Sequence, residues 1–178
     1  TFFVTSKGPD SLIKRMHDEG HTVALHTATH NYATVYASVE SYFNDLNSVK
    51  ARVKRITGYD ATIIRFPGGS SNTVSRKYKK GIMTDLTTQV QIKGYAYFDW
   101  NVDSGDASGN NVSASRITKN VLKQAKNKNS ICVLMHDTAA KGTTVKALPD
   151  IIEGLKKQGY KFEVLTEETY GYHYKVNN

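Results

Sequence analysis

Two histidines four residues apart, His26 and His30, follow a short apolar run at Val23–Leu25. If that run is a strand, both imidazoles lie on the loop that leaves one edge of a sheet. Imidazole is a good ligand for zinc and its first-row neighbours, and a carboxylate often completes an open catalytic site. Taken alone the spacing is weak evidence, because one histidine can be solvated and the other can cap a helix.

Further reactive side chains follow the later apolar runs. They are Arg65 and the Pro67-Gly68-Gly69 turn after the third run, Asp99, Asp103 and Asp106 after the fourth, and His136 with Asp137 after the fifth. In a parallel sheet these positions meet at the carboxyl edge, where (β/α) folds carry their active sites. Each has a structural alternative: an ion pair for Arg65, a plain turn for the glycines, an Asx-rich loop at 103–106, and a buried polar pair for His136 and Asp137. Because several successive apolar runs are each followed by such residues, we favour one functional site over these separate structural alternatives.

Together these groups predict hydrolytic chemistry. His26 and His30 would hold a metal that acidifies a bound water and polarises a carbonyl. His136 would protonate a leaving nitrogen, and an aspartate on its other ring nitrogen would fix its tautomer. The glycines after Pro67 leave room for backbone N–H groups to approach an oxyanion, and Arg65 is expected to orient a catalytic carboxylate.

Short apolar runs alternate with stretches of helical period, which predicts an α/β chain with a parallel sheet. The expected strands are Phe2–Val4, Val23–Leu25, Thr62–Phe66, Tyr95–Trp100, Ile131–Met135 and Phe162–Leu165. The expected helices cover 11–19, 39–56 between a Ser38 cap and Gly58, 74–90, 114–125 after Ser113, and 144–158 before Gly159. Periodicity does not separate a closed barrel from an open sheet. With no repeat or linker, we expect one domain over residues 1–178.

The formal net charge of +8 favours anionic partners, and Arg76, Lys77, Lys79 and Lys80 lie close together. No nucleic-acid recognition motif accompanies them, so we expect a solvated basic face and no nucleic-acid partner. No stretch approaches the ~18 apolar residues of a membrane span. The single cysteine, Cys132, lies in an apolar run and is expected to be an inert core residue.

These motifs, in this order, resemble the polysaccharide deacetylases, the NodB-homology group also called carbohydrate esterase family four. The family's His-Ser/Thr-x-x-His motif is matched at 26–30, and its Arg-x-Pro-x-Gly motif at 65–69. Its Asp-x-x-Asp-Trp motif is matched in part at 103–106, with Ala107 in place of the tryptophan. Its Leu-x-Met-His motif is matched by Leu134, Met135 and His136, with one residue fewer between leucine and histidine.

The resemblance implies a distorted (β/α) barrel that removes N-acetyl groups from amino sugars of an acetylated polysaccharide such as peptidoglycan or chitin. It implies that His26 and His30 bind a divalent metal, usually zinc. It makes His136 the acid, oriented by Asp106, and Arg65 the residue that positions the base.

Further roles that the resemblance implies concern the substrate. Gly68, next to Pro67, would offer a backbone N–H to the oxyanion, and Leu134 would line the pocket for the acetyl methyl. Trp100 could replace the missing groove tryptophan. The resemblance also implies an extracellular or cell-wall location, although the chain carries no signal-peptide pattern.

One family motif, Thr-Phe-Asp-Asp, has no match, because Thr1-Phe2-Phe3-Val4 resembles the strand that follows it. That motif supplies the catalytic base and the carboxylate ligand. We therefore expect a barrel without its first strand–helix unit, and a chain that alone binds zinc weakly and has little activity. Three alternatives stay open: an inactive carbohydrate-binding domain, an O-acetyl esterase, and a nucleic-acid binder suggested only by the charge.

Overall fold

The computed structural model describes residues 1–177. Their contacts divide the chain into two compact units. The first consists of Thr1–Asp99 and the C-terminal segment from Val164, and the second is Trp100–Glu163. Among the residues described, no helix is long and apolar enough to cross a membrane.

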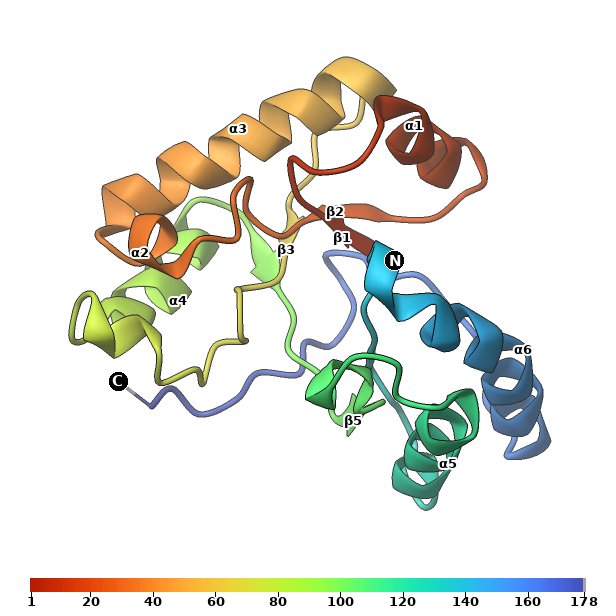
Figure 1. The fold of residues 1–178 in the computed structure, drawn as a ribbon. Helices are drawn as coiled ribbons and strands as arrows, with labels where there is room; N and C mark the ends of the chain where they lie inside the picture. Colours follow the sequence, from red (N-terminus) through yellow and green to blue (C-terminus); the bar gives the residue numbers. More distant parts are fainter. Residues whose placement is uncertain (178) are drawn as a thin grey trace. The chain divides into compact units, whose positions relative to one another are not determined.

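The first unit is built on a parallel sheet with the strand order β1-β2-β3-β4 (Figure 1). The strands are β1 (Phe2–Val4), β2 (Val23–Leu25), β3 (Ile63–Ile64) and β4 (Ala96–Tyr97). Val4 pairs with Leu25, Leu25 with Ile64, and Ile64 with Tyr97. Since parallel strands share one direction, this register brings the residues after all four strands to the same edge of the sheet.

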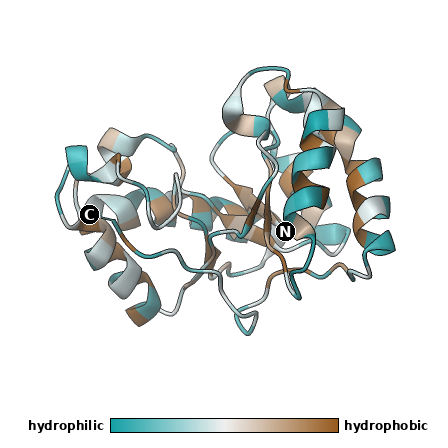
Figure 2. Cartoon of the chain, turned by 90° about the horizontal axis from the view of Figure 1, so that it is seen from below, coloured by the Kyte–Doolittle hydropathy of each residue, from teal (hydrophilic) through white to brown (hydrophobic). Residues whose placement is uncertain are grey.

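Helices supply the crossovers between these strands. They are α1 (Asp10–Asp18), α2 (Tyr32–Val35), α3 (Val39–Thr57), the 3-10 helix η1 (Ser75–Lys77) and α4 (Ile82–Ile92). The predicted caps of α3 are confirmed, because Ser38 Oγ accepts from Ser41 N at 3.0 Å and Gly58 has the left-handed φ of 75°. The buried stripe of α3 includes Tyr42, Leu46, Val49 and Val53 and packs into the core. In Figure 2 the helices carry brown and teal residues in alternation, as amphipathic helices do.

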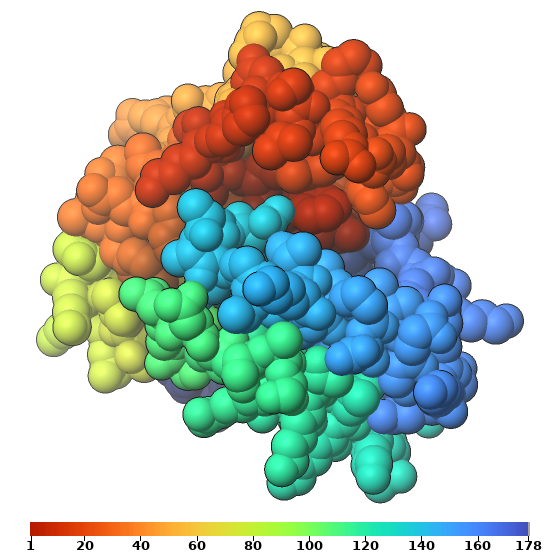
Figure 3. Space-filling view, turned by 45° about the vertical axis from the view of Figure 1, so that its right-hand side comes forward, coloured from red at the N-terminus to blue at the C-terminus, as the bar shows by residue number. Residues whose placement is uncertain are grey.

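The second unit contains the parallel pair β5 (Val102–Asp103) and β6 (Val133–Leu134). Its helices are η2 (Asp106–Ser108), α5 (Ala114–Ala125), η3 (Ala139–Lys141) and α6 (Gly142–Lys157). The two long helices pack against each other, and Figure 3 shows α6 in blue beside α5. Their contact buries Ile117, Val121, Ile151 and Leu155. The register Asp103↔Leu134 sets Ser104–Asp106 beside Met135 and His136.

One predicted strand was wrong, one predicted helix was wrong in part, and two short elements were not predicted. The strand expected at Phe162–Leu165 is an irregular segment. Its Leu165 N donates a hydrogen bond to Thr1 Oγ1, and its Leu165 O accepts one from Thr22 Oγ1, both at 2.9 Å. The helix expected over 74–90 is interrupted, because Gly81 takes a left-handed φ of 77°. Strand β5 and helix α2 were not predicted, since each is too short to show a period.

Candidate active site

The first histidine of the pair is held by the neighbouring strand. His26 directly follows β2, and its Nδ1 lies 2.7 Å from the carbonyl oxygen of Arg65, which follows β3. A carbonyl oxygen only accepts, so Nδ1 carries the proton and the lone pair of the neutral ring lies on Nε2. The ring of His30 is close, with 4.9 Å between the two ring centroids. A backbone carbonyl on one imidazole nitrogen is the usual support for a metal bond through the other.

The backbone between the two histidines is strained. Thr27 and His30 have positive φ values of 62° and 53°, a left-handed region that is uncommon for residues other than glycine and rare for a β-branched residue such as Thr27. Thr27 is fully buried, and its hydroxyl has no hydrogen-bond partner among the described residues. Such conformations persist only where the surrounding structure imposes them.

Asp45 imposes this loop conformation. It lies on α3, is 8% exposed, and accepts hydrogen bonds from Ala28 N at 2.5 Å and Thr29 N at 3.2 Å. Its second oxygen accepts from Thr29 Oγ1 at 2.7 Å. Asp45 was not predicted from the sequence. The sequence feature that could have revealed it is a carboxylate on the apolar face of the predicted helix, three residues after Tyr42.

The Pro67-Gly68-Gly69 turn presents a single amide. The Tyr36 hydroxyl donates to Pro67 O at 2.7 Å, and Gly69 N donates to Phe66 O at 2.8 Å. Pro67 and Gly69 are buried, whereas Gly68 is exposed. No acceptor for the Gly68 N–H occurs in the part of the chain that the structure describes. The turn therefore holds this N–H where an oxyanion could accept from it.

Only glycine fits at position 68. Its φ is 77°, and a Cβ there would lie 2.5 Å from the hydroxyl oxygen of Tyr32 and 3.1 Å from Asn72 Cβ. Tyr32 also meets the His30 ring edge-on, with 5.7 Å between centroids. Burial raises the pKa of the Tyr32 hydroxyl, which is therefore a neutral group beside both His30 and the turn. This tyrosine was not predicted, because α2, on which it lies, is too short to be recognised from its sequence pattern.

Arg65 is buried and braces the same edge of the sheet. Its Nε donates to Phe98 O at 2.9 Å and its Nη2 to Asp99 O at 3.1 Å. Its guanidinium carbon lies 4.2 Å from the centroid of the Phe3 ring. These contacts tie the ends of β3 and β4 together. Its expected role in orienting a catalytic carboxylate stays a prediction.

Asp99 is a second buried carboxylate at this edge, only 1% exposed. It accepts from Ser70 N and Tyr174 N, both at 2.8 Å, and also from the Ser70 hydroxyl. It therefore fixes the residue after Gly69 and fastens the C-terminal segment to the turn.

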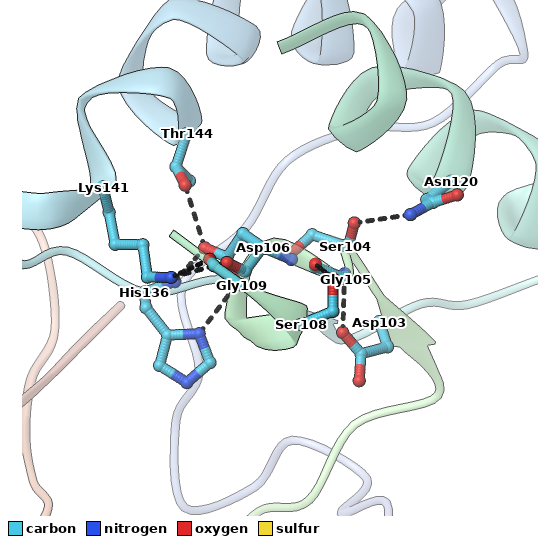
Figure 4. A network of polar contacts seen from close by, with 10 residues as sticks. All are labelled: Asp103, Ser104, Gly105, Asp106, Ser108, Gly109, Asn120, His136, Lys141 and Thr144. Atoms are coloured by element: carbon cyan, nitrogen blue, oxygen red, sulfur yellow. Dashed lines mark hydrogen bonds and ion pairs between the residues drawn. The ribbon is translucent and has the colours of Figure 1, made fainter. Parts of the chain in front are cut away.

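In the second unit, Asp106 and His136 form a tightly bonded pair (Figure 4). His136 Nδ1 lies 2.8 Å from Asp106 Oδ1, and His136 N donates to Oδ2 at 2.7 Å. The hydroxyl of Thr144, in the first turn of α6, also donates to Oδ2 at 3.0 Å. Burial alone would raise the pKa of Asp106, but the bonds from His136 and Thr144 outweigh it and lower the pKa from 3.8 to about 2. An ionised Asp106 keeps the proton of neutral His136 on Nδ1 and the lone pair on Nε2.

The two aspartates of the 103–106 motif have different tasks. Asp103 is exposed, and its carboxylate accepts from Gly105 N at 2.8 Å, as in an ordinary Asx turn. Asp106 is 1% exposed and serves His136. Lys141 adds support, because its Nζ donates to Asp106 O at 2.6 Å and to Gly109 O at 3.0 Å. Lys141 and Thr144 were missed, since nothing in their local sequence marks them.

The remaining predicted residues are half-buried. Leu134 ends β6 two residues before His136, and Trp100 begins the second unit. Thus the first unit brings together His26, His30 and the turn at Gly68, and the second brings together Asp106, His136 and Leu134. The substrate-binding roles of Leu134 and Trp100 stay predictions.

The histidine pair offers two metal ligands. His26 has the tautomer that suits a metal bond, and His30 lies beside it. Within residues 1–177, no group of three or more His, Cys, Asp or Glu side chains is arranged to hold a metal ion. The donors described thus fit part of a zinc site, and a carboxylate that would complete it is not among them.

Comparison with known proteins shows which family the chain is similar to. The family model for polysaccharide deacetylases matches residues 1–84. A peptidoglycan-N-acetylglucosamine deacetylase of Bacillus cereus is 34% identical over 99% of this chain and 62% of its own length. The catalytic domain of the Eubacterium rectale enzyme of the same name is 43% identical, with a TM-score of 0.95 over 99% of this chain and 80% of that one. A polysaccharide deacetylase from Bacillus cereus is 33% identical over 94% of this chain and 76% of that one, with a TM-score of 0.76.

The chain belongs to the polysaccharide deacetylase family. The predicted family and the α/β fold with parallel strands are thereby confirmed. The chain spans about three fifths of the curated relatives it matches: 62% of the Bacillus cereus deacetylase, and 57% of a putative polysaccharide deacetylase of Bacillus subtilis that is 32% identical to this chain.

The strained histidine loop should depend on Asp45. We expect Asp45→Ala to lower the free energy of unfolding of the first unit by about 2–3 kcal/mol, because buried N–H donors lose a charged acceptor. Urea denaturation followed by circular dichroism measures this. Asn44→Ala, at an exposed position of the same helix, is the matched control and should change little. Equal effects of the two substitutions would contradict the role given to Asp45.

Thr144 should help to keep Asp106 ionised. We expect Thr144→Val to raise the pKa of Asp106 and to lower the free energy of unfolding by about 1–2 kcal/mol at neutral pH. Because the folded-state pKa is depressed, this stabilisation is complete above pH 3.8 and disappears as the pH falls through about 2. The gap between wild type and variant should therefore close over that range.

Urea denaturation at a series of pH values measures this gap. Thr144→Ser keeps the hydroxyl and should behave like the wild type. A gap that is constant from pH 7 to pH 2, or a valine variant as stable as the serine variant, would show that the hydroxyl does not act on Asp106.

Proposed function

We propose that this chain is the catalytic part of a metal-dependent deacetylase that removes N-acetyl groups from the amino sugars of peptidoglycan. The observation that carries the proposal is the Asp106–His136 pair, in which a buried, ionised carboxylate fixes the tautomer of a half-exposed imidazole. The substrate is taken from the relatives, whose names specify peptidoglycan N-acetylglucosamine or N-acetylmuramic acid. A location outside the cell or at its wall accompanies that substrate as part of the proposal.

In this proposal His136 is the general acid. Asp106 accepts a hydrogen bond from the Nδ1–H of His136. The proton that His136 gives to the leaving nitrogen therefore comes from Nε2. The negative charge of Asp106 stabilises the imidazolium before transfer. Three donors surround that carboxylate and keep it from taking the proton itself.

The Gly68 N–H stabilises the charge on the carbonyl oxygen during attack. The turn around it is fixed on both sides, by Tyr36 at Pro67 and by Asp99 at Ser70. A fixed donor costs no reorganisation when the oxyanion forms, which is the condition for effective electrostatic stabilisation. An added side chain at position 68 would both strain the turn and meet the Tyr32 hydroxyl.

His26 and His30 would hold the metal, which we expect to be zinc. When bound, zinc supplies an acidified water and polarises the acetyl carbonyl. The Arg65 carbonyl keeps the Nδ1 proton of His26 in place, so that His26 binds through Nε2. With only two imidazoles among the described donors, we expect this chain by itself to bind zinc weakly.

Zinc affinity tests the metal part of the proposal. Isothermal titration of the chain with zinc should give a dissociation constant in the micromolar range or weaker, because two ligands leave the ion mainly hydrated. His26→Ala should abolish that binding, whereas His21→Ala, at an exposed histidine of the same unit, should leave it unchanged. Tight binding that survives His26→Ala would place the metal elsewhere.

The rate of acetate release tests whether His136 is the general acid. In a version of the chain extended before Thr1 by a strand that carries an aspartate pair, we expect His136→Ala to slow acetate release from an acetylated chitooligosaccharide by at least ~100-fold. Asp137→Ala, at the exposed neighbour, is the control and should retain activity. A near-wild-type rate for His136→Ala would remove this histidine from the mechanism.

The same assay separates the alternatives. Acetate released from acetylated xylan but not from the chitooligosaccharide would indicate an O-acetyl esterase. Glycan binding without any acetate release, and without dependence on added metal, would indicate an inactive carbohydrate-binding domain.

A further inference from the structure

The segment 76–80 concentrates positive charge on the first unit. Arg76, Lys77, Lys79 and Lys80 are all exposed and surround Tyr78; these five residues are called the basic segment below. Within residues 1–177, none of its four cations forms an ion pair with a carboxylate. The stretch 74–92 contains one acidic residue, Asp85. Four like charges therefore repel one another without compensation from the fold, and an external anion would relieve this repulsion.

The basic segment is held in a defined shape. Tyr78 N and Lys79 N both donate to Ser75 O, at 3.0 and 3.1 Å, and Lys77 N donates to Val74 O at 3.0 Å. Ser75 itself is fully buried, and the next helix begins with the buried pair Ile82 and Met83. A segment anchored at both ends loses little backbone entropy when a ligand binds.

A side-chain bridge joins the basic segment to the turn of the candidate site. Asn72 Oδ1 accepts from Ser75 N at 2.9 Å, and Asn72 Nδ2 donates to Gly69 O at 2.8 Å. The same asparagine thus fixes the start of the basic segment and the residue after Gly68. A polymer whose acetyl group lies at Gly68 would extend over neighbouring surface of this kind.

Tyr78 gives the basic segment a second recognition element. Its side chain is 46% exposed, and that of the nearby Val74 is 40% exposed. An exposed tyrosine offers a rigid apolar face with a hydrogen-bonding hydroxyl at its edge, which suits the face of a sugar ring. Cations beside an aromatic face match a glycan that carries carboxylates.

We propose that the basic segment is a binding surface for a carboxylate-bearing glycan polymer, with Arg76, Lys77, Lys79 and Lys80 contacting its acidic groups and Tyr78 a sugar ring. The inference rests on the proposed function, since the polymer is the one whose acetyl groups are removed. The lysines of the second unit at 119, 123, 126 and 128 are equally exposed, but no exposed aromatic residue lies among them. They provide a matched control.

Co-sedimentation with insoluble polymers tests this surface without requiring turnover. The probes are cross-linked carboxymethyl chitin, which carries carboxylates and stays insoluble, and unmodified chitin, which is neutral. The patch variant replaces all four cations of the basic segment by glutamine, and the control variant replaces the four lysines at 119, 123, 126 and 128 by glutamine. Both variants lose the same charge, and circular dichroism checks that both are folded.

We expect the wild type to bind carboxymethyl chitin more tightly than chitin, and the patch variant to lose about tenfold or more in affinity. The control variant should lose less than about threefold, since its four lysines are not part of the proposed binding surface. Tyr78→Ala should weaken binding to both polymers. Binding of the wild type to carboxymethyl chitin should fall as salt is added.

Equal losses in the two glutamine variants would overturn the proposal, because net charge alone would then explain binding. So would tight binding of duplex DNA with no retention on carboxymethyl chitin. The outcome is separable from the proposed function: a chain that releases no acetate but shows the patch-specific loss retains a glycan surface. A chain that deacetylates its substrate but whose patch variant loses no more affinity than the control variant is an enzyme without this glycan-binding surface.

Discussion

The parallel register of the first sheet is the constraint on which the histidine and glycine segments depend. Leu25 pairs with Ile64. The residues that directly follow these two strands, His26 and Arg65, therefore lie side by side. The 2.7 Å contact between His26 Nδ1 and Arg65 O follows from that pairing and selects the tautomer of the imidazole. A slip of one residue would turn His26 to the other face of the sheet.

Three buried carboxylates then fix the loops that leave the strands. Asp45, Asp99 and Asp106 are 8%, 1% and 1% exposed, and each accepts at least one backbone N–H from a segment that carries a candidate functional group. A buried carboxylate is costly without such donors, so each loop has one strongly favoured conformation. The rigidity of the candidate loops therefore comes from buried acids, of which Asp106 also contacts the proposed general acid His136 directly.

The sequence predicts the residues that perform chemistry better than those that hold them. His26, Gly68, Asp106 and His136 stand in spaced motifs, and the long amphipathic helices are visible from their period. Asp45, Tyr32 and Thr144 were missed because each acts through a contact far along the chain, such as the 38 residues between Thr144 and Asp106. Short elements were not predicted for a related reason: a two-residue strand such as β5 forms only by pairing with a partner strand.

The strain at Thr27 and His30 shows what the histidine loop gains from its support. Left-handed backbone at residues other than glycine costs roughly 1–3 kcal/mol each. The loop also buries the Thr27 hydroxyl without a partner among the described residues, so relaxed conformations would be lower in energy for the isolated segment. The three hydrogen bonds to Asp45 offset that cost and, in doing so, hold the centroids of the two imidazole rings 4.9 Å apart. A ligand pair ordered in advance spends little binding energy on organising itself, which makes the loop suited to an ion held by few protein donors.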